Sequence, residues 1–297
     1  MRRSFAQAVV SKHNQNDCFF LTGDLGFMAL ENVKASCGDR FINAGVAEQN
    51  MVGVAAGLAR EGYKVFVYSI APFCYARPFE QIRNDICLAN LPVCLVGNGG
   101  GYAYGTMGPT HHALEDCAVM NSLGIRVLVP AFDEDIPEMI SHISKPTYLR
   151  LGYDVRPEGT TIGAYSSWRE VLEGKRGAIA ALGPLAGVAW RALLDTPITD
   201  RPSVWAVSEF VEDEIPEGFW NQADGKTLFV MEEHVVAGGL GMHMAFAMVR
   251  KGVQVHGFVH RHATGYPNGR FGSQEFHRDQ SGLNAKGVLS MLSEVSP

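Results

Sequence analysis

Glu48 is the residue whose position most suggests chemistry. It lies in the string GVAEQN, in the first turn of a helix that the sequence predicts over residues 46–60. A carboxylate is favourable there because the helix dipole places partial positive charge at the N-terminus. The rest of the helix is small and apolar, which is typical of a buried or interface helix. An unpartnered carboxylate is costly there, so Glu48 is either an ordinary first-turn charge or a group positioned for acid–base work.

A second candidate, His111, follows a glycine-rich loop that covers residues 97–108. A single histidine is more often structural than catalytic, but this one stands at the end of a loop of small residues. Tyr102 and Tyr104 would form an aromatic rim on that loop, suited to stacking on a sugar or a nucleobase. The glycines do not fit G-x-G-x-x-G, so an open α/β nucleotide-binding protein is a weak alternative.

Short apolar runs alternate with amphipathic stretches in the first half, which predicts β-α-β units around a parallel sheet covered on both faces. The expected strands are residues 17–22, 41–43, 64–69, 91–96, 126–129 and 147–150. The expected helices are residues 46–60, 77–89, 115–123 and 133–144. These elements would carry both candidates.

The alternation lapses and then returns, which predicts two α/β domains. Residues 156–176 gather Gly, Ser, Thr and charge, so we expect a linker there, with room for a short hairpin. The domains would then cover residues 1–155 and 177–297. In the second domain, strands are expected at 178–182, 203–207, 227–232 and 253–259, and helices at 185–193 and 242–250.

Composition excludes several classes of protein. Among 297 residues, 46% are hydrophobic and 19% charged, which excludes a disordered tail, a collagen and a coiled coil. The net charge of -6 argues against a nucleic-acid partner. No apolar run approaches the roughly 18 residues of a membrane span, and the N-terminus lacks the apolar core of a signal peptide. We therefore expect a cytoplasmic protein.

The cysteines form no C-x-x-C pair and most lie in apolar segments. This spacing argues against a zinc site and against a disulfide framework. We expect free buried thiols in a reducing compartment, and no metal ligands in this chain. The six cysteines are Cys18, Cys37, Cys74, Cys87, Cys94 and Cys117.

Several strings together resemble one enzyme family. GVAEQN with its Ala/Gly-rich helix resembles the pyrimidine-binding domain of transketolase and of 1-deoxyxylulose-5-phosphate synthase. Residues 71–83 (APFCYARPFEQIR) look like the aromatic loop and helix of split transketolase subunits. Three further matches follow in the family's order: GPTH at residues 108–111, VLVPAFD at 127–133, and EEH with GGLG within 232–241. The matches span nearly the whole chain, so their combination is specific.

The resemblance implies thiamine diphosphate as cofactor and assigns roles to four residues. The family glutamate hydrogen-bonds N1′ of the aminopyrimidine and so promotes loss of the proton from C2 of the thiazolium. Glu48 occupies that position. Phe73 matches the aromatic residue that stacks on the pyrimidine, and Ile70 takes a neighbouring position. Asp24 matches an aspartate near the thiazolium, although a plain turn residue is the alternative.

The resemblance also implies a missing half. The family's diphosphate and Mg²⁺ domain carries G-D-G followed by N-N, whereas this chain has Gly23-Asp24-Leu25 and no N-N dipeptide. We therefore expect a separate N-terminal diphosphate-binding subunit, an α₂β₂ assembly, Mg²⁺ held mainly by that partner, and no activity of this chain alone. The helix after Glu48 is the expected interface.

The family's sugar-phosphate contacts are the part that this sequence departs from. His111 matches the histidine that contacts substrate oxygens. Met107 and Gly99, however, stand where the family has an aspartate and a histidine, Met28 replaces a serine, and Tyr153 aligns near the phosphate-binding arginine. The weaker substrate candidates are His112, Tyr104, Met107, Arg150 and Tyr153.

The sequence thus predicts the C-terminal (β) subunit of a transketolase-like enzyme. It would transfer a two-carbon ketol or acyl unit, as a carbanion carried on thiamine diphosphate, to an aldehyde or ketone. The lost contacts favour an atypical acceptor: a modified or unphosphorylated sugar, or a nucleotide-linked one. The β subunit of a 2-oxo acid dehydrogenase E1 component and a non-catalytic transketolase-like scaffold remain alternatives.

Overall fold

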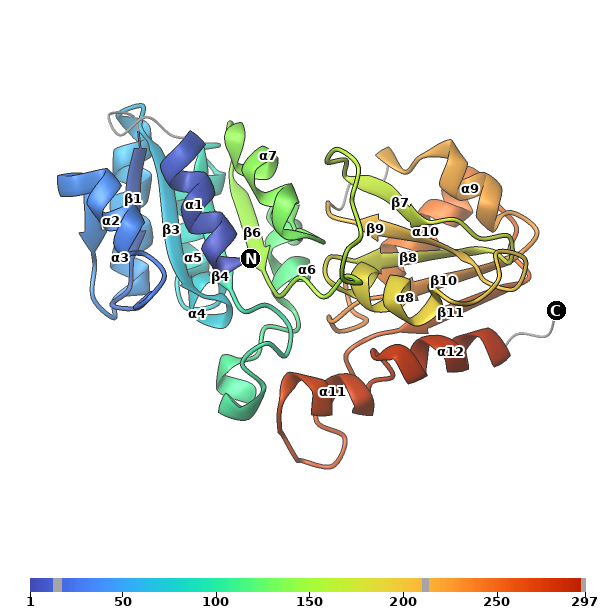
Figure 1. The fold of residues 1–297 in the computed structure, drawn as a ribbon. Helices are drawn as coiled ribbons and strands as arrows, with labels where there is room; N and C mark the ends of the chain where they lie inside the picture. The colour runs from blue at the N-terminus through green and yellow to red at the C-terminus, as the bar shows by residue number, and fades with distance from the viewer. Residues whose placement is uncertain (13–17, 210–213, 295–297) are drawn as a thin grey trace.

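The computed structural model describes residues 1–12, 18–209 and 214–294. Over these ranges the chain forms two α/β halves, each a sheet with helices on both faces (Figure 1). The fold class expected from the sequence is confirmed. The division at residues 155 and 177 stays a prediction.

The sheet of the first half has six strands in the order β2-β1-β3-β4-β6-β5. Every neighbouring pair is parallel, as the alternation of strands and helices predicted. Its carboxyl edge therefore gathers the loops that follow all six strands. The strands are β1 (Cys18–Thr22), β2 (Phe41–Asn43), β3 (Lys64–Ile70), β4 (Val93–Asn98), β5 (Arg126–Leu128) and β6 (Thr147–Leu151).

Helices cover both faces of this sheet. Phe5, Phe20 and Tyr68 belong to the core on one face, and Met51 and Ile82 belong to the core on the other. The segment expected as one helix over 77–89 is a short α-helix followed by a π-helical turn at Ile82–Cys87. The helices are α1 (Arg2–Lys12), α2 (Glu31–Cys37), α3 (Glu48–Arg60), α4 (Ala71–Tyr75), α5 (Phe79–Gln81), α6 (Asp116–Ser122) and α7 (Ile136–Ser141).

The sheet of the second half is mixed, in the order β11-β10-β8-β9-β7. Its edge strand β7 runs antiparallel to β9 and lies inside residues 156–176, the segment expected as a linker. Buried Trp168 starts β7. The strands are β7 (Trp168–Leu172), β8 (Ala178–Leu182), β9 (Ser203–Val207), β10 (Thr227–Met231) and β11 (Gly257–Arg261). The helices are α8 (Leu185–Leu193), α9 (Glu217–Ala223), α10 (Leu240–Lys251), α11 (Gln274–Gln280) and α12 (Ala285–Ser293).

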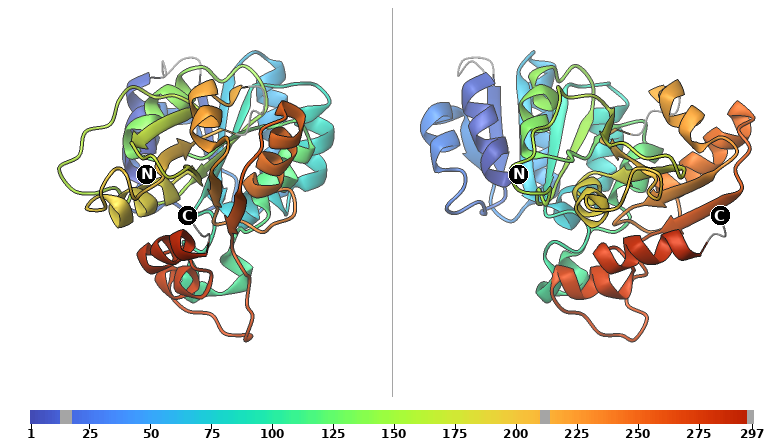
Figure 2. Two further views of the ribbon diagram at one scale, coloured as in Figure 1. Left: turned by 90° about the vertical axis from the view of Figure 1, so that its right-hand side faces the viewer. Right: turned by 45° about the vertical axis from the view of Figure 1, so that its right-hand side comes forward.

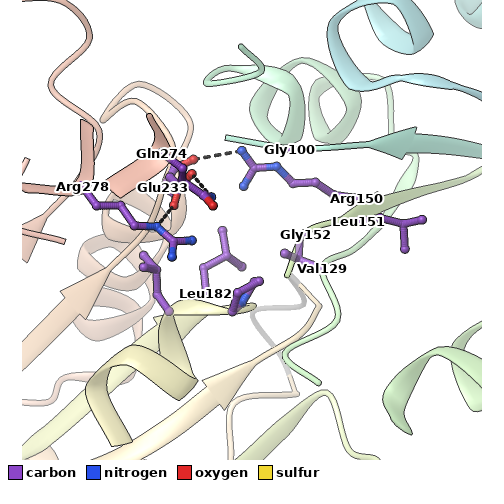
Figure 3. A pocket seen from close by; sticks show the side chains of 11 residues that line it. Gly100, Val129, Arg150, Leu151, Gly152, Leu182, Glu233, Gln274 and Arg278 are labelled. Atoms are coloured by element: carbon purple, nitrogen blue, oxygen red, sulfur yellow. Dashed lines mark hydrogen bonds and ion pairs between the residues drawn. The ribbon is translucent and has the colours of Figure 1, made fainter. Parts of the chain in front are cut away.

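A buried network of charges ties the two halves together (Figure 3). Arg150, which is 5% exposed, forms an ion pair with Asp116 at 2.9 Å and donates to the backbone oxygen of Glu233 at 2.9 Å. The Glu233 carboxylate in turn pairs with Arg278 at 2.5 Å and accepts from Gln274 at 2.9 Å. The cavity between these side chains measures about 20 Å³, room for about one water molecule. This network therefore fixes the interface between the halves.

The glycine-rich loop of the first half is anchored by the second half. Tyr102 is fully buried, its ring stacks on His277 at 4.4 Å, and its hydroxyl hydrogen-bonds to the backbone of Gly265. A Cβ on Gly105 would lie 2.5 Å from backbone atoms at the start of α11. Both views of Figure 2 show this loop against α11. The second half thus positions the loop that leads to His111.

None of the six cysteines is paired in a disulfide. Burial raises the pKa of the thiols of Cys74, Cys94 and Cys117, so these thiols stay protonated and unreactive. Among the residues that the structure describes, no helix has the length and apolar character that a membrane span requires.

Candidate active site

Glu48 begins α3 and is buried against an arginine. Its side chain is 6% exposed, and Oε1 lies 2.5 Å from Nη1 of Arg77. The guanidinium of Arg77 also lies over an aromatic ring, with its Cζ 3.8 Å from the ring centroid of Phe73. Glu48 and Phe73 thus present a carboxylate and an aromatic face to the same planar group. That combination suits a flat ligand with a donor on its edge.

His111 also contacts Phe73 and extends this group of side chains. The ring centroids of Phe73 and His111 are 5.1 Å apart in an edge-to-face arrangement, and those of Tyr104 and His111 are 6.2 Å apart. Nδ1 of His111 lies 2.9 Å from the hydroxyl of Thr110. Glu48, Phe73, His111 and Tyr104 therefore form one continuous series across the carboxyl edge of the first sheet.

The order of the strands explains why these residues meet. Ile70 is the last residue of β3 and pairs with Asn98, the last residue of β4. Phe73 follows Ile70 in α4, whose first turn contains Pro72, while the glycine-rich loop follows Asn98. The sequence therefore places Phe73 and the loop next to each other because their strands are neighbours. Ile70 itself is half-buried at the base of this site.

Asp24 lies on a loop beside the turn that leads to Glu48. Asn43 links the two loops: its side chain donates to the Asp24 carboxylate at 3.0 Å and accepts from the backbone N–H groups of Asp24 and Gly45 at 2.9 and 3.0 Å. Asp24 holds a left-handed backbone angle of +54°. With Phe27 and Lys34 it lines an open cavity of about 360 Å³.

Tyr104 and Tyr153 line a separate cleft of about 350 Å³, together with Gly99. The Tyr104 hydroxyl accepts a hydrogen bond from Asn98 at 2.7 Å. Two cationic side chains, Arg2 and Arg3 at the start of α1, line the same cleft. Because Tyr104 also faces His111, this cleft adjoins the group formed by Glu48, Phe73 and His111.

The remaining substrate candidates lie elsewhere. His112 is buried, and its ring nitrogens contact the Tyr266 hydroxyl at 2.6 Å and the Gly105 oxygen at 3.0 Å. Burial lowers the pKa of His112. Arg150 belongs to the network between the halves, where burial opposes its charge but Asp116 raises its pKa overall. Met107 is 55% exposed in the turn at Gly105–Met107.

Three arginines at these sites did not emerge from the sequence. Arg77 follows Phe73 by four residues, a spacing that places two side chains on one face of a helical segment and could have indicated their contact. Arg2 and Arg3 carried no comparable signal, because only the packing of α1 against α7 and its neighbours brings them to the cleft.

One buried group among the described residues has the spacing of metal ligands: Asp116, Cys117 and His234 place their ligand atoms within 4.8 Å of one another. Asp116 already pairs with Arg150 and accepts from Tyr148, and Nε2 of His234 accepts from a backbone N–H group. These contacts make the group part of the buried polar network.

Comparisons with known proteins agree with this geometry. The family model "Transketolase, pyrimidine binding domain" matches residues 3–152, half of the chain. An apulose-4-phosphate transketolase subunit of Phocaeicola vulgatus is 33% identical over 163 residues, covering 53% of this chain and 52% of that protein. The 1-deoxy-D-xylulose-5-phosphate synthase 2 of Geobacter sulfurreducens is 30% identical over 278 residues, covering 86% of this chain and 42% of that protein. The alignments thus span about half of these curated relatives.

A solved structure described as "Split gene transketolase, inactive beta4 tetramer" matches along almost its entire length. The TM-score is 0.79 at 28% sequence identity, covering 99% of this chain and 96% of that one. The match extends through both sheets and confirms the resemblance to a split transketolase subunit. The chain therefore belongs to the transketolase family, and its first half is a transketolase pyrimidine-binding domain.

Proposed function

We propose that this chain is the β subunit of a transketolase-type enzyme that uses thiamine diphosphate. It would transfer a two-carbon ketol, or a related acyl unit, to an aldehyde or ketone acceptor. The observation that carries the proposal is the arrangement of Glu48 and Phe73, a buried carboxylate beside an aromatic face, both in contact with one flat cationic group.

The residues present fit an aminopyrimidine. Glu48 would share a proton with the ring nitrogen N1′ in a hydrogen bond, Phe73 would stack on the face of the ring, and Ile70 would pack beside it. Asp24, on the neighbouring loop, would lie toward the thiazolium. When bound, thiamine diphosphate supplies a nucleophilic carbon that accepts and releases the transferred unit. His111, next to Phe73, would hydrogen-bond to substrate oxygens.

A partner subunit would supply the diphosphate and Mg²⁺ site. The absence of G-D-G and N-N motifs from the sequence supports this, as does the fact that one relative is itself named as a single subunit of a transketolase. Large apolar side chains are exposed on the loops after the neighbouring strands β1 and β2: Phe27, Met28 and Val46 are 74–83% exposed. Exposed apolar groups of this kind mark interfaces. We propose that they, together with α3, contact the partner in an α₂β₂ assembly.

The cleft beside Tyr104 would receive the acceptor. Its tyrosines suit a sugar or nucleobase face. Tyr153 aligns near the family's phosphate-binding arginine, and Arg2 and Arg3 supply positive charge to the same cleft. The two arginines favour an acceptor that carries phosphate, as a sugar phosphate or as a nucleotide-linked sugar, over the unphosphorylated sugar that the sequence alone allowed. Replacing both arginines by glutamine should raise KM for such acceptors and leave KM for a neutral sugar unchanged.

Calorimetric titration of thiamine diphosphate with Mg²⁺ would test the proposal. We expect binding to this chain mixed with a co-expressed diphosphate-domain subunit, and no binding to this chain alone. Glu48→Gln and Phe73→Ala should each abolish or weaken binding, whereas the matched variant Phe246→Ala, at an exposed position of α10 in the second half, should not. Tight binding to the single chain would contradict the division of the cofactor site.

Substrate tests on the mixed subunits would then separate the alternatives. Ketol transfer between sugars supports the transketolase-type activity. Oxidation of a 2-oxo acid with lipoamide or a dye would instead assign the chain to a dehydrogenase E1 component. A stable complex that binds no cofactor would identify a scaffold subunit.

A further inference from the structure

We propose that Arg77 occupies the place of the aminopyrimidine ring in the cofactor-free chain, and that cofactor entry displaces its guanidinium from Glu48 and Phe73. The inference rests on the proposed function and adds a step to it. Arg77 would be a placeholder: a side chain that satisfies the cofactor-binding residues until the cofactor replaces it.

Two contacts place the guanidinium in the position that the ring would need. Nη1 donates to Oε1 of Glu48 at 2.5 Å, and Cζ lies 3.8 Å from the centre of the Phe73 ring. A separation of 3.8 Å is van der Waals contact, so no second planar group fits between Arg77 and Phe73. The same carboxylate oxygen and the same aromatic face therefore cannot serve Arg77 and the cofactor together.

The chemistry of the two groups explains why one can replace the other. A guanidinium is planar and delocalised, carries N–H donors on its edge, and stacks on aromatic rings with its face. An aminopyrimidine that is protonated at N1′ presents the same combination of a flat face and an N–H donor on its edge. Glu48 and Phe73 are thus complementary to both groups.

Burial explains why a placeholder is useful. The Glu48 side chain is 6% exposed, and a buried carboxylate without a partner is costly. In the cofactor-free chain Arg77 supplies the positive charge that removes this cost. When the cofactor supplies a donor of its own, Arg77 is no longer needed.

Arg77 is also placed to leave without disturbing the fold. Its side chain is 42% exposed, so the guanidinium can rotate into solvent. Its backbone is held, because the Gln49 side chain donates to the Arg77 oxygen at 3.3 Å and Pro78 restricts the residue before it. The expected motion is therefore a side-chain rotation in the turn between α4 and α5.

Displacement of Arg77 should lower the measured affinity for the cofactor. Cofactor binding then includes breaking one half-exposed ion pair and one cation–π contact, so the apparent affinity is lower than the intrinsic one. Contacts of this kind correspond to roughly a five- to thirtyfold change in an equilibrium constant. Removing the guanidinium should strengthen cofactor binding by about that factor.

The test compares Arg77→Met with Arg83→Met in the complex with the diphosphate-domain subunit. Arg83 is the matched control, since it lies over Phe79 in the same helical segment, with 5.9 Å between Cζ and the ring centroid. Calorimetry with thiamine diphosphate and Mg²⁺ should show roughly five- to thirtyfold tighter binding for Arg77→Met and no change for Arg83→Met. Arg77→Lys keeps the charge without the planar face and should fall between wild type and Arg77→Met.

A second readout follows the arginine itself in the complex with the diphosphate-domain subunit. The ¹⁵N–¹H signal of the Arg77 side chain, assigned by its loss in Arg77→Lys, should shift when 4-amino-5-hydroxymethyl-2-methylpyrimidine is added at millimolar concentration. The corresponding Arg83 signal should stay in place.

The possible outcomes separate this inference from the proposed function. Tighter binding by Arg77→Met supports both. Unchanged or weaker binding by Arg77→Met, with binding weakened in Glu48→Gln, overturns the placeholder and makes Arg77 a bystander or a cofactor contact, while the proposed function stands. No binding by any variant, in a complex shown to form, overturns both.

Discussion

Two arginine–carboxylate pairs in this molecule have the same chemistry and opposite surroundings. Arg77 and Glu48 approach to 2.5 Å, with side chains 42% and 6% exposed. Arg150 and Asp116 approach to 2.9 Å, with side chains 6% and 0% exposed. Burial of both partners makes a pair part of the fold, because neither charge can return to water without a large cost. Exposure of one partner makes the pair exchangeable.

The other contacts of the two arginines support the same distinction between the pairs. Arg150 also donates to the backbone oxygens of Ala113 and Glu233, so it joins the loop after His111 to the second half. Arg77 instead rests on the face of Phe73, a contact with no fixed direction along the ring. The Arg150 pair therefore belongs to the fold, whereas the Arg77 pair lies at the position that we propose for the cofactor.

The largest expected effect is on kcat, when the Glu48 carboxylate is replaced by an uncharged amide. Glu48→Gln should lower kcat of the reconstituted enzyme by roughly 10²–10⁴-fold, because the amide cannot act as the positioned base. Unfolding in urea should change little, since a glutamine side chain has nearly the same shape as a glutamate. Steady-state kinetics measures kcat, and urea titration measures the free energy of unfolding. Full activity in Glu48→Gln would remove Glu48 from catalysis.

Breaking the buried pair of Arg150 and Asp116 should mainly lower stability. Arg150→Met leaves the Asp116 charge buried and should lower the free energy of unfolding by about 3–5 kcal/mol. Urea unfolding measures this, with Arg156→Met as control, because Arg156 pairs with the half-exposed Glu134. The double variant Arg150→Met with Asp116→Asn should recover part of the loss. If Arg150→Met alone lowered the free energy of unfolding only slightly, the two pairs would not differ in their importance for stability.

A smaller effect is expected from pH. Burial lowers the pKa of His112 and of His277, whose rings meet at 5.0 Å. The unfolded chain takes up these protons near pH 6.5, before the folded chain does, so stability should be full above pH 6.5 and fall as pH drops below it. Thermal unfolding between about pH 7.5 and 5.5 measures the slope. The slope should flatten in His277→Gln and persist in the exposed-site control His142→Gln.

The smallest effect is expected for the free energy of unfolding of Arg77→Met. Water can reach Glu48 from the side that Arg77 vacates, so the loss should be about 1–2 kcal/mol, the same amount that displacement of Arg77 takes from cofactor binding. The same urea titration that serves Arg150→Met gives this value. A loss of about 3 kcal/mol or more would mean that both pairs are structural.

Local patterns were enough to predict most of the first sheet and to single out half of the residues of the candidate site. The apolar runs at β1, β3 and β4 are short and bounded by turns, so their period is clear. Helix α1 and strand β7 were missed because their polar residues mask the pattern: β7 reads WREVL, and its Arg169 is buried only through an ion pair with Asp135.

In the candidate site, too, residues identified by their sequence neighbours could be predicted, whereas residues whose surroundings come from distant parts of the chain could not. Glu48 and Phe73 follow from strings of neighbouring residues. The environment of Arg150 depends on Asp116 and Glu233, which are far from it in the sequence, so its burial could not be predicted. Arg77 depends on a turn between two short helices whose path only the folded backbone defines.

Asn43 has a consequence for anyone who wishes to redesign this protein. Its one side chain is bonded to the loop that carries Asp24 and to the turn that precedes Glu48. The two segments are therefore a single module, and neither can be exchanged for a homologous loop while the other is kept. A graft that transfers residues 23–48 as one block should keep its shape, whereas a graft of either loop alone leaves the other without its support.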